Sequence, residues 1–162
     1  MVGMSVFIVS GHLGGGKTLW AVKKARDYLG NQKRVASNIT FSVDKLCKHD
    51  NKMSYIKLPL IPRGSDLHDL GRAYEGDYDE SKNGLVILDE AGTWLNSHDW
   101  KDKDRRELFR WITHARKLGW DVILIIQDYN SLDRQIKDSV SEIVVKTAHA
   151  NRIITRSQLL VA

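Results

Sequence analysis

The sequence predicts an α/β fold, a three-layer sandwich in which a mostly parallel sheet carries helices on both faces. Three observations lead to this prediction. Apolar runs at residues 6–9, 85–88 and 122–126 have the continuous hydrophobicity of strands that are buried on both faces. Residues 17–29 and 104–118 follow the spacing of amphipathic helices. Strands and helices alternate along the chain, which is typical of this fold class.

Length and composition are those of an ordinary globular protein. The 162 residues are 42% hydrophobic, so we expect one domain spanning residues 1–162 with its own core. The formal net charge of +5 weakly favours an anionic partner such as nucleotide, nucleic acid or acidic lipid. Cys47 is the single cysteine, which excludes an intrachain disulfide and favours a reducing, cytosolic setting. No stretch approaches the roughly 18 apolar residues of a membrane span, and no signal peptide is recognisable.

The N-terminal part of the chain is expected to form a strand–helix–strand unit. Residues 6–9 form the first strand and residues 17–29 the first helix, which Gly30 and Asn31 end. A second strand at 34–39 follows after a short return, so the two strands should run parallel. The polar middle of the chain is expected to contain a short helix at 43–49, a strand at 55–60, a helix at 66–74 and a solvated loop at 75–84.

The C-terminal half begins with the buried strand at 85–88. Residues 91–103 are expected to form a loop, whose Trp94 and Trp100 belong either to a local core or to an oligomer contact. The helix at 104–118 turns Trp111 inward and ends at Gly119. The remaining expected elements are a strand at 122–126, a helix at 132–140 with Ile136 facing inward, and strands at 142–147 and 152–155.

A glycine-rich segment joins the first strand to the first helix and fits the phosphate-binding pattern G-x-x-x-x-G-K-[ST] at every fixed position. Its glycines let the backbone turn tightly, so that N–H groups and a helix N-terminus face an anion. Lys17 would reach the β- and γ-phosphates of ATP, and the Thr18 hydroxyl would bind Mg²⁺. The residues expected to bind the nucleotide are Gly11, His12, Leu13, Gly14, Gly15, Gly16, Lys17, Thr18 and Leu19.

Two acids follow the apolar run at 85–88 and fit a Walker B element. Asp89 at the strand end would hold Mg²⁺ through water. Glu90 would orient and deprotonate the attacking water as a general base. Acids at strand ends often only begin a loop, but a preceding phosphate-binding loop favours the catalytic interpretation. The histidines and Cys47 have no metal-binding spacing, so we predict no zinc site.

Two further residues complete the predicted catalytic set. Gln127 ends the very apolar strand at 122–126, at the sheet edge where α/β proteins bind ligands, so it could sense the γ-phosphate or the water. Phosphoryl transfer also needs a cation at the developing charge, and an arginine can be supplied by a neighbouring subunit. Arg116 is the first candidate, followed by Arg105, Arg106, Arg110 and Arg134.

Three blocks resemble the N-terminal ATPase domain of the zonula occludens toxin family, which includes the gene I morphogenesis proteins of filamentous phages. They are Gly-His-Leu-Gly-Gly-Gly-Lys-Thr-Leu-Trp-Ala-Val (11–22), Val-Ile-Leu-Asp-Glu-Ala-Gly-Thr-Trp-Leu-Asn (86–96) and His-Ala-Arg-Lys-Leu-Gly-Trp-Asp-Val-Ile-Leu-Ile-Ile-Gln-Asp (114–128). The resemblance covers most of residues 4–140. The third block is also similar to the Arg-x-x-Gly…Gln signature of the FtsK–HerA translocases.

The resemblance implies a P-loop NTPase fold with sheet order 5-1-4-3-2 and Gln127 beside the phosphates. It also implies a ring-shaped homo-oligomer, such as a hexamer, that hydrolyses ATP at the cytoplasmic face of the host inner membrane to power phage extrusion. Phage coat proteins and secretin-type export components are the implied partners. Family members continue into a membrane span and a periplasmic part that this sequence lacks, so we expect a truncated or soluble short form.

Other functions remain open at this point. A DNA translocase or packaging ATPase of the same superfamily would differ in nucleic-acid-stimulated turnover and salt-sensitive binding. A small-molecule kinase is disfavoured because no arginine-rich lid is evident and Glu90 stands where a hydrolytic base would. The same glutamate argues against a nucleotide switch that does not hydrolyse ATP.

Overall fold

The computed structural model describes residues 6–47, 54–95, 103–132, 134–139, 142–147 and 153–155. The strands of this part of the chain form one sheet of order β3-β2-β4-β5-β1-β6-β7. Neighbouring strands are parallel, except that β7 runs antiparallel to β6. The strands are β1 (Val6–Ser10), β2 (Arg34–Ser37), β3 (Ser54–Lys57), β4 (Gly84–Leu88), β5 (Trp120–Ile126), β6 (Glu142–Thr147) and β7 (Ile153–Thr155).

The predicted strand order is confirmed. When β1, β2, β4, β5 and β6 are counted as strands one to five, their order in the sheet is 5-1-4-3-2. The strand between the two motif-bearing strands β1 and β4 is β5, which pairs with both. The additional strand β3 extends the sheet beyond β2. This is the arrangement of a P-loop NTPase fold, and it brings the ends of β1, β4 and β5 to one sheet edge.

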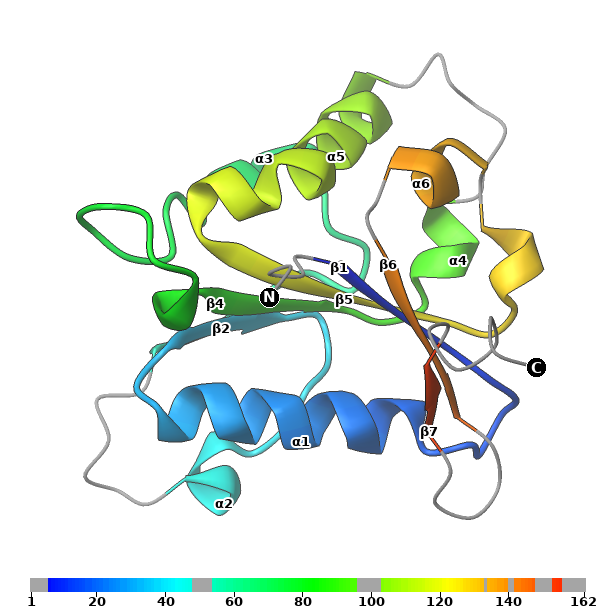
Figure 1. Ribbon diagram of the computed structural model, residues 1–162, viewed down its shortest axis with the longest axis horizontal. Helices are drawn as coiled ribbons and strands as arrows, with labels where there is room; N and C mark the ends of the chain where they lie inside the picture. The colour runs from blue at the N-terminus through cyan, green and yellow to red at the C-terminus, as the bar shows by residue number, and fades with distance from the viewer. Residues whose placement is uncertain are drawn as a thin grey trace.

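Helices cover both faces of the sheet, as Figure 1 shows with the sheet seen nearly edge-on. The long helix α1 lies on one face together with α2, while α3 and α5 lie on the other. The helices are α1 (Lys17–Gly30), α2 (Val43–Leu46), α3 (Gly64–His68), α4 (Ala91–Trp94), α5 (Lys103–His114) and α6 (Arg134–Ser139). Three short 3₁₀ helices are η1 (Glu80–Lys82), η2 (Ala115–Leu118) and η3 (Tyr129–Ser131).

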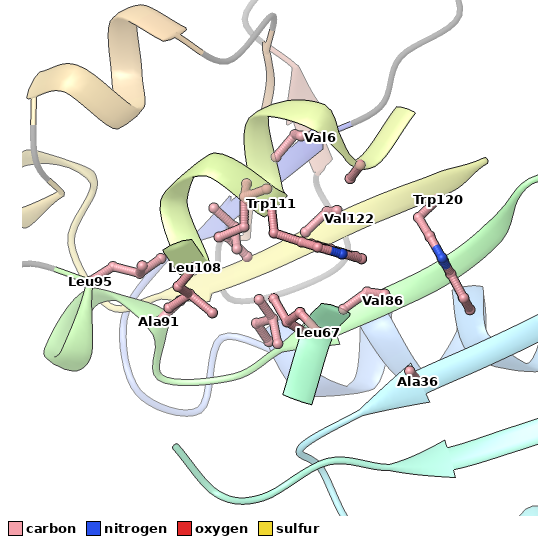
Figure 2. Close-up of a cluster of buried hydrophobic side chains, with 14 of the residues drawn as sticks. Val6, Ala36, Leu67, Val86, Ala91, Leu95, Leu108, Trp111, Trp120 and Val122 are labelled. Atoms are coloured by element: carbon pink, nitrogen blue, oxygen red, sulfur yellow. The ribbon is translucent and has the colours of Figure 1, made fainter. Parts of the chain in front are cut away.

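The core has two parts because strand side chains alternate between the faces. Along β5, Val122 and Leu124 face the larger cluster, which contains Trp111 of α5 (Figure 2), whereas Ile123 faces the cluster under α1. Strand β5 is buried over its whole length. Its continuous hydrophobicity therefore reflects a strand covered on both faces, as the sequence predicted.

The helix α1 packs through a narrower face than its sequence suggests. Ala21, Ala25 and Leu29 are fully buried against the sheet, whereas Leu19 is 61% exposed. Two alanines four residues apart let the helix axis approach the sheet closely. Leu19 therefore does not belong to the core, and its position at the start of the helix leaves it beside the phosphate-binding loop.

Several predicted element boundaries were wrong. The helix expected at 66–74 is α3, which begins earlier because Asp66 Oδ2 accepts from the backbone N–H of Arg63 at 2.7 Å. The helix ends at His68. The expected loop at 91–103 begins instead with α4, while Trp100 lies outside the described residues. The helix expected at 104–118 changes to the 3₁₀ helix η2 after His114.

Candidate functional site

The phosphate-binding loop follows β1 and ends where α1 begins at Lys17. Gly14 and Gly16 have φ angles of 76° and 81°, which residues with a Cβ rarely adopt, so this loop conformation requires glycine. The Lys17 Nζ donates hydrogen bonds to the carbonyls of Gly11 at 2.6 Å and His12 at 2.9 Å. Gly11 and His12 thus hold the lysine ammonium inside the loop, where it can meet an anion.

A cavity of about 360 Å³ lies against this loop, a volume typical of small-molecule sites. Asp89, Glu90 and Gln127 come to it from the ends of two other strands, β4 and β5. Leu13 and Leu19 also line it and are 80% and 61% exposed. The complete lining is Leu13, Gly14, Gly15, Gly16, Lys17, Thr18, Leu19, Asp89, Glu90, Ile125, Ile126 and Gln127.

The two acids after β4 form a tight turn. Glu90 has φ 53° and ψ 26°, a left-handed conformation that is uncommon for a residue other than glycine. Its N–H donates to Asp89 Oδ1 at 2.8 Å, and its carbonyl accepts from the N–H and the hydroxyl of Thr93 at 3.0 and 2.8 Å. The Trp94 indole N–H donates to the Asp89 carbonyl at 3.4 Å. Trp94 is half-buried against the larger core cluster, so it supports this turn.

Asn38 also holds this turn, and sequence reasoning missed it. It directly follows β2, and its side chain is buried with 4% exposure. Its Oδ1 accepts from the Asp89 N–H at 2.7 Å, and its Nδ2 donates to the carbonyls of Asp89 at 3.1 Å and Leu60 at 2.9 Å. A polar residue near the end of a predicted parallel strand was a signal for this sheet edge, but the contact with Asp89 follows from the pairing of β2 with β4, which the sequence does not show.

The residues predicted to hold Mg²⁺ suit that ion chemically. Thr18 and Asp89 both line the cavity, one from the start of α1 and one from the end of β4. A hydroxyl and a carboxylate are oxygen ligands, and Mg²⁺ is commonly held by one or two protein oxygens together with substrate phosphates and water. The donor set therefore fits Mg²⁺ accompanied by a nucleotide.

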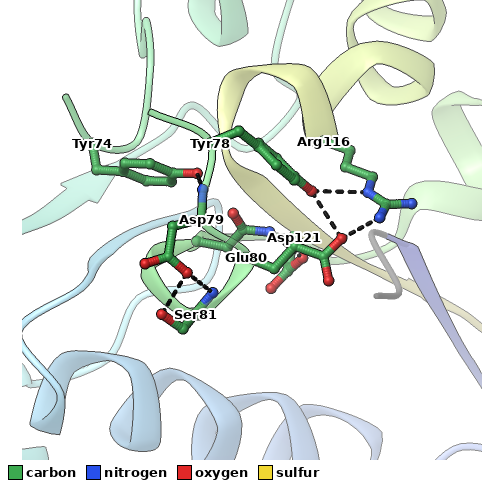
Figure 3. Close-up of polar contacts among 8 residues, drawn as sticks. Tyr74, Tyr78, Asp79, Glu80, Ser81, Arg116 and Asp121 are labelled. Carbon is green, nitrogen blue, oxygen red and sulfur yellow. Dashed lines mark hydrogen bonds and ion pairs between the residues drawn. The ribbon is translucent and has the colours of Figure 1, made fainter. Parts of the chain in front are cut away.

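Arg116 lies away from this cavity. It belongs to η2, which precedes β5, whereas Gln127 follows the same seven-residue strand. A strand of that length spans roughly 20 Å. The Arg116 Nε donates to the Tyr78 hydroxyl at 2.9 Å and its Nη2 forms an ion pair with Glu80 (Figure 3). Arg116 is therefore not brought together with the predicted nucleotide site of its own chain.

Comparisons with known proteins identify the family of this chain and agree with its fold. A family model described as zonular occludens toxin (Zot) matches residues 5–156. The chain is 42% identical over 153 residues to the Gene 1 protein of Escherichia phage If1, which covers 93% of this chain and 43% of that protein. It is 39% identical over 153 residues to the Gene 1 protein of Enterobacteria phage fd, with coverage of 93% and 44%. The chain thus spans less than half the length of the curated relatives it matches.

Solved structures share the fold at lower sequence identity. The N-terminal domain of zonular occludens toxin from Neisseria meningitidis superposes with a TM-score of 0.52 at 20% identity, covering 93% of this chain and 81% of that one. The genome packaging NTPase B204 from Sulfolobus turreted icosahedral virus 2, solved in complex with AMP, gives a TM-score of 0.56 at 13% identity, with coverage of 93% and 79%.

Within the described residues, each helix is too short or too polar to cross a bilayer.

Proposed function

This chain belongs to the zonular occludens toxin family, and from that premise we propose that it is an ATP-hydrolysing motor domain that powers filamentous phage assembly and extrusion. One observation carries the proposal. A single cavity is lined by a phosphate-binding loop, by the acids after β4 and by the glutamine after β5. These groups are the phosphate cradle, metal ligand, base and sensor that ATP hydrolysis requires.

Each residue has a defined task in the proposed reaction. The backbone N–H groups of the loop and the Lys17 ammonium bind the phosphates. Glu90 takes a proton from a water molecule, whose oxygen bonds to the γ-phosphorus while the bond to the bridging oxygen of ADP breaks. Gln127 orients that water or contacts the γ-phosphate. Thr18 and Asp89 would hold Mg²⁺, which neutralises phosphate charge when bound.

Lys17→Ala tests the site most directly. We expect this variant to lose ATP binding or turnover, measured by calorimetric titration and by phosphate release. Lys23→Ala is the matched control, since Lys23 is an exposed lysine on the same helix that does not line the cavity. Unchanged ATPase activity in the Lys17 variant would refute the assigned site.

The motor is proposed to act as a ring-shaped homo-oligomer at the cytoplasmic face of the host inner membrane, with phage coat and export proteins as partners. Residues 1–162 serve as one catalytic domain in this proposal. Because Arg116 lies far from its own cavity, it would have to act on the nucleotide of a neighbouring subunit. The phosphate charge that develops during hydrolysis is what such an arginine stabilises.

Nucleic-acid translocation is a second candidate function, favoured by a row of basic side chains on α5 and η2. Lys103, Arg106, Arg110 and Lys117 are exposed at helical spacing, with His114 between the last two. Along an ideal helix this row would extend roughly 20 Å. Single-stranded DNA that raises the ATPase rate, with binding that weakens steeply at higher salt, would support translocation. An ATPase rate that does not change with DNA would exclude DNA translocation and favour the extrusion motor.

A further inference from the structure

A buried asparagine contacts the backbone of the acidic turn from both sides. The Asn38 amide accepts from the Asp89 N–H at 2.7 Å and donates to the Asp89 carbonyl at 3.1 Å. We infer that Asn38 is a positioning residue that holds the Asp89–Glu90 turn in its catalytic geometry. This inference rests on the proposed function, because it assigns Asn38 a role in the same hydrolytic reaction.

Only an amide side chain meets the hydrogen-bonding demand of this position. One oxygen must accept from a backbone N–H, while one nitrogen must donate to two carbonyls, those of Asp89 and Leu60. An aspartate would turn a second oxygen toward these two carbonyls, and an alanine would leave all three part-buried backbone groups without this partner. The last paired residues of β2 and β4 are Ser37 and Ile87. Beyond them, the Asn38 side chain joins the two chain segments through its hydrogen bonds to Asp89.

The turn depends on such support because its backbone is in an uncommon conformation. Glu90 adopts a φ of 53°, which a residue with a Cβ retains only when its surroundings hold it there. Asn38 fixes the preceding residue, and Thr93 fixes the Glu90 carbonyl. A change in the Asp89 backbone would rotate both acidic side chains relative to the cavity that they line. A displacement of about 1 Å in a catalytic group can lower a rate about 10²-fold.

The same asparagine ties the turn to the segment after β3. Its Nδ2 binds the carbonyl of Leu60, and its own carbonyl accepts from Lys57 Nζ at 2.6 Å. Leu60 and Ile61 are 75% and 60% exposed. Asn38 therefore connects this exposed segment directly to the acidic turn that lines the cavity.

The test measures kcat, ATP affinity and melting temperature for Asn38→Ala and for Asn38→Asp, which keeps the shape and the acceptor but not the donor. We expect kcat to fall about 10- to 100-fold, the usual effect of losing a group that orients a metal ligand, while ATP affinity stays near that of the unaltered chain. Asn83→Ala is the matched control. Asn83 is equally buried, at 3% exposure, and its Nδ2 donates to Asp121 Oδ1 at 3.0 Å beside the opposite sheet edge. It should lower the melting temperature but leave kcat unchanged.

Combination with Glu90→Gln separates positioning from general stability. If Asn38 acts through this turn, the combined loss in kcat is smaller than the product of the two single losses. Independent, multiplicative losses would overturn the inference, as would a folded Asn38→Asp protein with the kcat of the unaltered chain. Failure of the unaltered chain to hydrolyse ATP would instead overturn the proposed function, and the inference with it.

Discussion

Polar groups lie at both ends of the parallel strands, which are the carboxyl and amino edges of the sheet, but their surroundings differ. At the carboxyl edge, Lys17, Asp89 and Gln127 line an open cavity. Near the amino edge, the polar side chains pair with one another instead: Asp121 accepts from Tyr28 at 2.6 Å and from Asn83 at 3.0 Å. Chemistry is therefore to be expected at the edge where side chains face a cavity, while the other edge holds the helix α1 to the sheet.

Shifted pKa values in this protein occur in structural networks of hydrogen bonds. Burial raises the pKa of Asp121, although hydrogen bonds from Tyr28 and Asn83 act in the opposite direction. Hydrogen bonds from Arg116 and Tyr78 lower the pKa of Glu80 (Figure 3). Shifted pKa values often mark active sites, but structural networks produce them too. Both of these groups lie near the amino edge and outside the cavity, so their shifted pKa values belong to structural networks.

The largest expected effect concerns Arg116, which lies near the amino edge. Catalysis by this residue would mean that the amino edge is not only structural. If Arg116 acts on the nucleotide of a neighbouring subunit, Arg116→Ala should lower the rate of ATP hydrolysis by assembled subunits roughly 10³- to 10⁵-fold without lowering ATP affinity. Phosphate release should be measured against protein concentration, since specific activity should rise as subunits associate. Lys23→Ala is the control, because Lys23 is an exposed cation outside both the cavity and the basic row on α5 and η2.

Mixing two inactive variants tests the same residue in another way. Arg116→Ala combined with Glu90→Gln should recover activity, because one mixed interface then has both groups intact. A mixture that stays inactive while the subunits demonstrably associate shows that Arg116 does not act between subunits. The amino edge would then be structural throughout, apart from any contact with partners.

Glu90→Gln is expected to have the next largest effect and tests whether catalysis belongs to the carboxyl edge. Loss of a general base typically lowers kcat about 10²- to 10⁴-fold, whereas the phosphate-binding loop that supplies affinity is untouched. ATP binding should therefore persist, as measured by calorimetry, while phosphate release slows. Loss of binding together with a normal residual rate would assign Glu90 a different role.

Tyr28→Phe should affect stability and not catalysis. Removing the hydroxyl leaves the buried Asp121 Oδ2 without this donor, which costs about 1–3 kcal/mol in the free energy of unfolding. Urea denaturation measures this loss, and phosphate release at a temperature where the variant is folded should be unchanged. Tyr55→Phe is the control, with a smaller loss, because the Tyr55 hydroxyl donates to the neutral carbonyl of Ile39. A rate loss in folded Tyr28→Phe would contradict the division between the edges.

The sequence alone predicted most of the fold and the linear motifs. The strands β1, β4 and β5 were recognisable because their burial on both faces requires continuous hydrophobicity. The phosphate-binding loop at Gly11–Thr18 was recognisable because all of its fixed positions lie within a few consecutive residues. Contacts made across the sheet were not predictable. Asn38 meets Asp89 only through the pairing of β2 with β4, and Arg116 meets Glu80 only when η1 and η2 come together. The start of α3 also depended on a local cap that residue spacing does not show.

The smallest expected effect concerns the pH dependence of stability at the amino edge. Because burial raises the pKa of Asp121 in the folded protein, the native state binds this proton more tightly than the unfolded chain, whose Asp pKa is about 3.9. The contribution of this carboxyl to stability is therefore most favourable below that value and is lost as pH rises through the folded pKa. Asp121→Asn removes the charge and keeps the shape.

The substituted amide can also satisfy both neighbours. Its oxygen can accept from Asn83, and its nitrogen can donate to the Tyr28 oxygen, because a phenol both donates and accepts. Asp121→Asn should consequently be as stable as the unaltered chain or slightly more so at pH 8, and relatively less favourable at pH 4, with urea denaturation at both values as the measurement. Asp79→Asn provides a control of opposite sign, because hydrogen bonds from Ser81 lower the pKa of Asp79 and its contribution is lost as pH falls. A marked loss of stability for Asp121→Asn at pH 8 would mean that the ionised carboxylate, and not merely a hydrogen-bonded group of this shape, holds α1 to the sheet.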